Sequence, residues 1–315
     1  MGKSTKQDDK KNLAILFLSI FIGLLIILGT WEGDDAPDLV DEGNNLSKKF
    51  NEYWYQGLAE ISHFSLQQAR YDEIHNGDAV LIYVTEDFLT DIHVKSEHSA
   101  MAQNTTSVIK LNLIKKFITG VYPYSVMSSI FTPINREQFP QTLKISASSQ
   151  EWCGHTYLQL NPRKLLYQGS RHSYFMKEAD QKISAGSGLL EDEIWNTIRM
   201  NPADLPVGDI ELIPGSQFCL LNHITPGIAQ AEAQLIEEGD KFKYVIKYRN
   251  LARKLNIIFN RSFPYDIMEW EETRTNKDQD NSILKTRAVR TDILLLDYWN
   301  KNHVSDSVYR SKLGL

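Results

Sequence analysis

Alternation of apolar and polar residues, which is typical of a strand with one solvent-facing side, recurs along most of the chain from Ala59 onward. Ala59–Leu66 alternates in this way, and the continuous apolar run Ala79–Val84 predicts a strand covered on both faces. Asn76-Gly77 predicts the tight turn of their hairpin. Further strands are expected at Val108–Phe117, Tyr122–Phe131, Leu143–Ser149, Thr156–Leu160, Lys164–Tyr167, Ser173–Met176, Ile210–Ile213, Phe218–His223, Ala229–Glu237, Lys241–Tyr248, Lys254–Phe259 and Ile267–Thr273.

Helical spacing of apolar residues occurs in Leu46–Tyr55 and most clearly in Gly188–Met200. The second helix has acidic residues near its start, where the helix dipole favours them, and Asn201-Pro202 ends it. Because the strands are close together with short turns, antiparallel pairing is favoured over βαβ units. We expect a mainly β protein of the α+β class, with large, curved antiparallel sheets and a few helices. A subdivision near residues 188–206 is the one boundary that the pattern suggests within residues 46–315.

An uncharged apolar segment, Leu13–Gly29, precedes these elements. Its seventeen residues would span about 26 Å as a helix, enough for a thin bilayer. Lysines flank only its N-terminal side, and Trp31 follows it at the position of a headgroup. The pattern predicts a cytoplasmic tail at residues 1–12, a transmembrane helix at residues 13–30 and a tether at residues 31–45.

A cleaved signal peptide is the alternative for this segment, although the run is long for one and ends without a small-x-small site. Both interpretations place residues 46–315 outside the cytoplasm, which means the periplasm in a bacterium with two membranes.

Composition and the absence of known motifs argue against several classes of function. The chain has 34 Lys and Arg against 40 Asp and Glu, a net charge of −6, which argues against nucleic acid as the main partner. Two cysteines exclude a disulfide-rich scaffold and a four-cysteine zinc module. We find no glycine-rich phosphate loop, no Gly-x-Ser-x-Gly and no His-Glu-x-x-His in the sequence. No cofactor and no nucleotide is therefore expected.

The densest group of chemically active residues is Glu151, Cys153 and His155. In a continuous strand these three share one face, and His172 could be a fourth partner. Such a cluster could bind a metal ion or form a Cys–His nucleophile. Alternatively, the segment is a bend at Gly154 whose polar groups bond to the backbone. A Cys153–Cys219 disulfide is also open, and it would exclude Cys153 as a nucleophile.

Two charged pairs have a structural and a functional interpretation. Glu86-Asp87 predicts a turn at a strand end, and the alternative is a catalytic pair of carboxylates. Lys285 and Arg287 share one face of a strand, which is either solvated or meets an anionic partner.

Several strings resemble a family of envelope proteins whose members often carry the label "septum formation inhibitor Maf". They are Trp54–Ile61, Gln68–Tyr71, Ala79–Phe88, Gly120–Ser125, Gln150–His155 and His172–Phe175. That label implies a nucleotide pyrophosphatase with an N-terminal Ser-x-Arg-Arg loop and an α/β fold. This sequence departs from both features, so the resemblance implies a membrane-anchored envelope family and no nucleotide chemistry.

Three functions are consistent with the sequence. The favoured one is a non-enzymatic binding or carrier module, with a lipid or glycolipid ligand suggested by analogy with curved sheets. The second is a metal-dependent or Cys–His hydrolase at Glu151, Cys153, His155 and His172. The third is a structural envelope protein that binds another protein.

Overall fold

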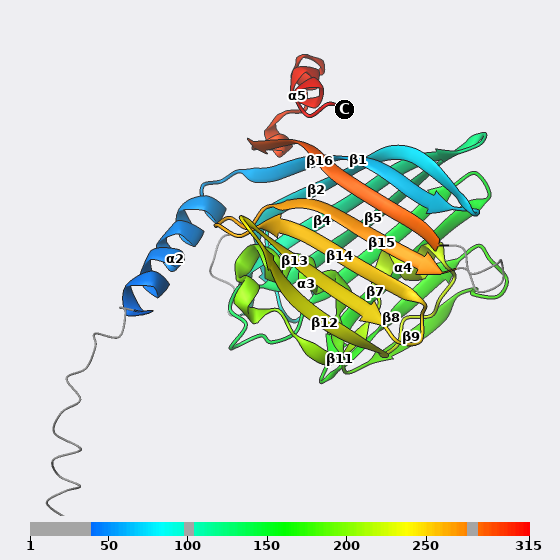
Figure 1. Ribbon diagram of the computed structural model, residues 1–315, viewed down its shortest axis with the longest axis horizontal. Helices are drawn as coiled ribbons and strands as arrows, with labels where there is room; N and C mark the ends of the chain where they lie inside the picture. Colours follow the sequence, from blue (N-terminus) through cyan, green and yellow to red (C-terminus); the bar gives the residue numbers. More distant parts are fainter. Residues whose placement is uncertain (1–38, 98–103, 276–282) are drawn as a thin grey trace, which may run out of the picture. The chain divides into compact units, whose positions relative to one another are not determined.

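One large antiparallel sheet makes up most of the structure (Figure 1). The computed structural model describes residues 39–97, 104–275 and 283–315, and sixteen strands of these residues form the sheet. The strand order is β10-β11-β12-β13-β14-β15-β16-β1-β2-β4-β5-β6-β7-β8-β9, with β3 paired to β2. Neighbouring strands are antiparallel except for the short parallel pair β10 and β11. The predicted mainly β fold is confirmed.

The strands are β1 Ala59–Arg70, β2 Glu73–Leu89, β3 Val94–Lys95, β4 Thr105–Thr119, β5 Tyr122–Pro133, β6 Lys144–Glu151, β7 Gly154–Arg163, β8 Leu166–Ser173, β9 Gln181–Gly186, β10 Leu189–Leu190, β11 Gly208–Ile213, β12 Ala229–Glu238, β13 Lys241–Tyr248, β14 Arg253–Asn260, β15 Ile267–Thr275 and β16 Ile283–Leu296. The helices are α2 Leu39–Trp54, α3 Glu191–Met200, α4 Ser216–Leu221 and α5 Ser307–Lys312, with 3-10 turns at Pro202–Asp204, Tyr298–Asn300 and Val304–Asp306.

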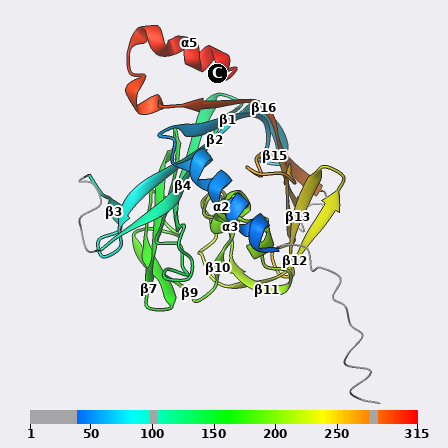
Figure 2. The ribbon, with the colours of Figure 1, turned by 90° about the vertical axis from the view of Figure 1, so that its left-hand side faces the viewer.

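The sheet curls so that its two edge strands, β9 and β10, are joined by only two residues, Ser187-Gly188. Helices α3 and α4 lie on the concave side, with α3 visible through the curve in Figure 2. Every residue of α4 is buried, and so is α3 from Glu191 to Arg199. Because α3 is enclosed, its acidic residues cannot face solvent and must find partners inside the protein.

The β1–β2 turn differs from the sequence prediction. It is made by Tyr71 and Asp72, both at positive φ (52° and 61°), whereas Asn76-Gly77 lies inside β2. A Cβ atom on Gly77 would lie 2.1 Å from the carbonyl oxygen of Lys116, so glycine serves close strand approach here. Glu86-Asp87 also lies inside β2 rather than in a turn.

Several other predicted elements differ from the structure. The expected strand Phe218–His223 is helix α4 followed by a turn, because its apolar residues are enclosed on all sides. The strands expected at Lys164–Tyr167 and Ser173–Met176 are replaced by one strand, β8, from Leu166 to Ser173, and residues 174–178 form a bend and a turn. The helix predicted from Gly188 begins at Glu191, since Leu189 and Leu190 pair with β11.

Residues 49–315 form one compact unit, and the segment 188–206 lies within it rather than at a boundary. Helix α2 begins at Leu39, inside the segment expected to be a tether. Across residues 39–97, 104–275 and 283–315, no helix has both the length and the apolar character needed to cross a bilayer. The predicted anchor Leu13–Gly29 lies outside these residues.

Candidate functional site

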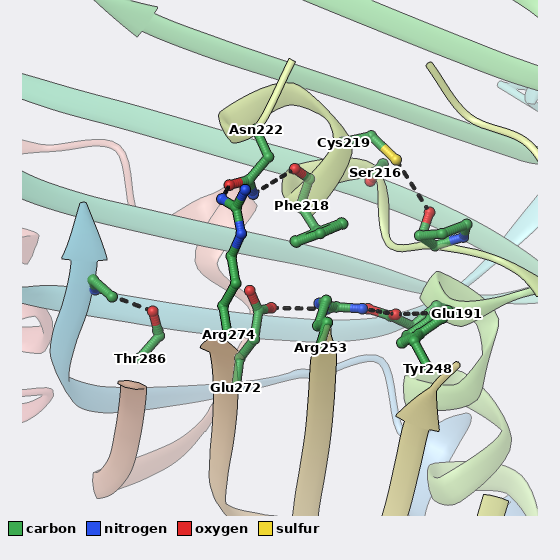
Figure 3. A network of polar contacts seen from close by, with 12 residues as sticks. Glu191, Ser216, Phe218, Cys219, Asn222, Tyr248, Arg253, Glu272, Arg274 and Thr286 are labelled. Atoms are coloured by element: carbon green, nitrogen blue, oxygen red, sulfur yellow. Dashed lines mark hydrogen bonds and ion pairs between the residues drawn. The ribbon is translucent and has the colours of Figure 1, made fainter. Parts of the chain in front are cut away.

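A cavity of about 110 Å³ lies between the concave face of the sheet and α4. It is lined by Gln68, Ala69, Arg70, Tyr71, Asp72, Lys115, Phe218, Leu221, Asn222, Glu272, Arg274, Leu284 and Thr286. A second cavity of about 40 Å³ shares Lys115, Phe218 and Glu272 with it and extends toward α3. Figure 3 shows the polar network between these two spaces.

Strand alternation places charged side chains in this cavity. Side chains two residues apart in a strand face the same side of the sheet. On β4, the buried residues Leu111 and Leu113 are followed at the same parity by Lys115. On β15, the buried Trp270 is followed by Glu272 and Arg274. The inward-facing rows are therefore apolar in the middle of the sheet and become charged toward one end.

Lys115 is the most unusual residue of the cavity. It is only 9% exposed, and its ammonium has no hydrogen-bond or ion-pair partner among the residues that the structure describes. Burial lowers the pKa of Lys115, and the nearby Glu272 carboxylate opposes that change. A buried cation without a partner is costly, so its retention calls for a reason other than stability.

Arg70 and Arg274 bring two further positive charges to the same space. Arg70 donates to the carbonyl oxygen of Leu221 and, at 3.4 Å, to the Tyr124 hydroxyl. Its Nε is buried without a hydrogen-bond partner. Arg274 donates to the side-chain oxygen of Asn222 on α4 (Figure 3). In the described chain all these acceptors are neutral, so neither guanidinium is neutralised by an ion pair.

Arg253 sits deeper and forms ion pairs with two carboxylates. Its Nη2 donates to Glu191 Oε1 at 2.8 Å and to Glu272 Oε2 at 2.7 Å (Figure 3). Burial alone would raise the pKa of Glu272, but Arg253 and Lys115 outweigh it and hold that pKa below its usual range. Glu272 is therefore ionised at neutral pH and places a negative charge in the lining of the larger cavity near Lys115.

The Asp192 carboxylate has a different environment, because its hydrogen-bond partner is Ser216, an uncharged residue at the start of α4. Both the backbone N–H and the hydroxyl of Ser216 donate to its carboxylate at 2.8 Å. Burial dominates and raises the pKa of Asp192 to about 7. This carboxyl group is therefore a proton donor or acceptor near neutral pH, directly beside the smaller cavity.

The residues singled out from the sequence do not form one cluster. Trp152 and Cys153 are the two-residue turn between β6 and β7, which breaks the strand alternation that would have aligned Glu151, Cys153 and His155. Glu151 borders a small space with Arg70 and Thr156, whereas His155 and His172 line a separate depression. Within the described residues, no three His, Cys, Asp or Glu side chains lie together in a way that could hold a metal ion.

The polar partners of His172 and Cys153 lie close to them in the chain. His172 Nδ1 lies 3.2 Å from Asp180 Oδ1, and both side chains are exposed. The backbone N–H of Cys153 donates to Glu151 Oε2 at 2.6 Å, and Glu151 raises the pKa of the Cys153 thiol. Both cysteines are free: Cys153 is exposed, while Cys219 is buried in α4 with its Sγ 3.6 Å from the Pro214 carbonyl oxygen.

Sequence reasoning missed the cavity because its residues come from five separate segments of the chain. One signal was available: Lys115, Arg70 and Glu272 each stand where an alternating strand places its inward residue. The helix dipole explains the acidic run at Glu191 in the sequence, whereas the structure pairs Glu191 with Arg253.

Comparison with models of protein families and with curated proteins finds no match to this chain. Among solved structures, the chain is similar to the beta-barrel-like protein of the domain of unknown function DUF1849 from Brucella abortus. The two share 7% sequence identity over 76% of this chain and 98% of that chain, with a TM-score of 0.43. A similarity at this level carries no function from one protein to the other.

Proposed function

We propose that this protein is a binding module whose cavity receives the anionic group of its ligand, a phosphate or a carboxylate. The observation that supports this is the convergence of Arg70, Lys115 and Arg274 on one cavity without an ion pair in the described chain. Anionic groups are the natural partners of such charges, and hydrogen bonds to charged groups are the strong ones.

The charge count agrees with an anionic ligand. Arg253 pairs with both Glu191 and Glu272, which leaves one negative charge among these three residues. Together with those of Lys115, Arg70, Arg274 and Asp72, these charges around the two cavities sum to +1. One added negative charge would bring the cavity close to neutrality.

The size of the cavity restricts what enters it. A cavity of about 150 Å³ holds a benzene ring, so about 110 Å³ suits a phosphate or a short carboxylate. An acyl chain would need a longer apolar space than this polar cavity provides. The lipid or glycolipid ligand expected from the architecture is therefore proposed only through its charged headgroup, with the rest of the molecule outside the cavity.

The proposal includes membrane attachment through Leu13–Gly29 and an extracytoplasmic position of the sheet. The sequence pattern of residues 1–31 supports this attachment. A metal-dependent or Cys–His hydrolase is not favoured, because Glu151, Cys153 and His155 face different surroundings.

The test is calorimetric titration of the full chain in detergent with inorganic phosphate, and separately with acetate. We expect Lys115→Met to weaken phosphate binding at least tenfold. Lys116→Met is the matched control, because the neighbouring lysine is exposed on the opposite face of β4. Arg274→Gln should weaken binding as well. Equal effects of the Lys115 and Lys116 variants, or no binding of either anion, would refute the proposal.

A further inference from the structure

Four hairpin tips lie along one end of the sheet, at the right-hand side of Figure 1. They are the β1–β2, β4–β5, β6–β7 and β8–β9 connections. The strand registers place them together: Gly77 at the start of β2 pairs with Phe117 near the end of β4, and Ser125 pairs with Gln150. Thr156 likewise pairs with Ser173 beside the β8–β9 connection. We refer to these four tips together as the rim.

Each tip of the rim exposes a large apolar or aromatic side chain. Val121 is 77% exposed, Trp152 is 70% exposed and Met176 is 91% exposed. Tyr71 and Tyr174 are also exposed at their tips. Such side chains cost free energy in water, and their recurrence in four separate turns is a pattern rather than a single exposed residue.

Neighbouring aromatic rings hold part of the rim in place. The Tyr122 hydroxyl donates to the Tyr71 hydroxyl at 3.2 Å, and the Tyr71 and Tyr124 hydroxyls are 2.6 Å apart. The rings of Tyr122 and Trp152 have centroids 6.4 Å apart. Tyr71, Tyr122 and Trp152 therefore form a continuous aromatic strip across three hairpins.

The chemistry of the rim matches a membrane interface. Trp and Tyr are the residues enriched at the headgroup level, with aliphatic side chains below them. Lys116 and Lys177, exposed near these tips, have no ion pair in the described chain and could meet lipid phosphates. The acidic residues Asp72, Glu73 and Glu151 also lie at the rim, so attraction to anionic lipid is modest and apolar insertion dominates.

We infer that the rim docks on a lipid bilayer, with Val121, Trp152 and Met176 inserted at the headgroup level. The apolar segment Leu13–Gly29 would keep the chain close to such a surface. Tyr71 and Asp72 belong both to the rim and to the lining of the 110 Å³ cavity, so a docked rim places the cavity mouth near headgroups. The inference stands on the exposed tips and does not require the anion site.

Cys153 allows a direct test in the full chain. It is exposed in the same turn as Trp152, and Cys219 is buried, so a fluorescent nitrobenzoxadiazole maleimide would label one position. The labelled chain is reconstituted in phosphatidylcholine vesicles, with and without phosphatidylglycerol, and recovered by flotation. We expect a blue shift of the emission and protection from aqueous iodide on vesicles.

The matched control places the same label at the opposite end of the sheet. Leu165, 75% exposed in the turn between β7 and β8, is replaced by cysteine in a Cys153→Ser background. This label should stay accessible to iodide. A second variant, Val121→Asp with Met176→Asp, changes only exposed side chains and should abolish the shift at Cys153. Equal accessibility of the labels at 153 and 165 on vesicles would overturn the inference, and so would failure of the chain to float.

Discussion

Arg199 of α3 and Glu60 of β1, which are 139 residues apart in the chain, form a bidentate ion pair inside the protein. Both guanidinium Nη atoms lie 2.5 Å from the two carboxylate oxygens, and both side chains are almost completely buried. The Tyr53 hydroxyl donates to the same carboxylate, and the guanidinium lies over the rings of Trp54 and Tyr83. This pair fastens α3 to the end of the sheet opposite the rim.

Removing one partner of this pair leaves a buried charge alone. We expect Arg199→Met to lower the free energy of unfolding by about 3–5 kcal/mol. Replacing both residues, with Glu60→Met added, should recover most of that loss because no unpaired charge remains. Urea denaturation followed by circular dichroism measures both values. If the double variant is as unstable as the single one, desolvation of the lone carboxylate is not the cause.

Replacing Lys115 should stabilise the fold, in contrast to replacing Arg199. Its pKa is lowered in the folded state by burial, so the unfolded chain binds the proton more tightly. Unfolding free energy should therefore rise as pH rises through the window between the folded pKa and 10.5. At neutral pH, Lys115→Met should stabilise the fold by about 1–3 kcal/mol while it removes phosphate binding. A variant that loses both stability and binding would instead mark Lys115 as a structural residue.

The Asp192 carboxyl group should make the free energy of unfolding depend on pH with the opposite sign. Burial raises its pKa from 3.8 to about 7 in the folded state, so the folded protein holds a proton that the unfolded chain has released. The free energy of unfolding contributed by this group should fall as pH rises between these values. Asp192→Asn should flatten that part of the profile, measured as the difference between the two proteins in thermal or urea unfolding. Parallel profiles would show that Asp192 is ionised when folded.

Gly77 tests the close approach of β2 and β4. Gly77→Ala brings a methyl group against the carbonyl of Lys116 and should cost about 1–3 kcal/mol of stability. Gly227→Ala is the control, since its added Cβ meets nothing within 4 Å. A similar stability of both variants would mean that the strands separate at no cost.

The two thiols should react very differently. In the native protein one thiol, Cys153, should react with Ellman's reagent, and two should react after denaturation without reductant. Because Glu151 raises the pKa of Cys153, Glu151→Gln should accelerate the reaction. Absence of thiols in the unreduced denatured chain would indicate the disulfide that the structure does not contain.

Local pattern was sufficient for most strands. Segments such as Tyr122–Phe131 and Lys241–Tyr248 alternate strongly enough that their own residues decide their structure, and both are strands. The turn predicted at Asn76-Gly77 is wrong because glycine occurs both in tight turns and where two strands approach closely. Only the position of β4 distinguishes these two roles. The strand predicted at Phe218–His223 is wrong because an apolar run of this length is equally typical of an enclosed helix.

The sequence by itself determined the β-rich class and the order of most strands, because hydrophobic alternation is a property of neighbouring residues. It could not determine that the sheet curls around α3 and α4, since that depends on contacts between residues far apart in the chain. Nor could it show that Arg70, Lys115, Glu272 and Arg274 meet at one cavity, or that the turn at Trp152-Cys153 separates Glu151 from His155. A charged residue on a strand acquires its partners and its desolvation only when the sheet closes over it, and the tertiary structure alone decides both.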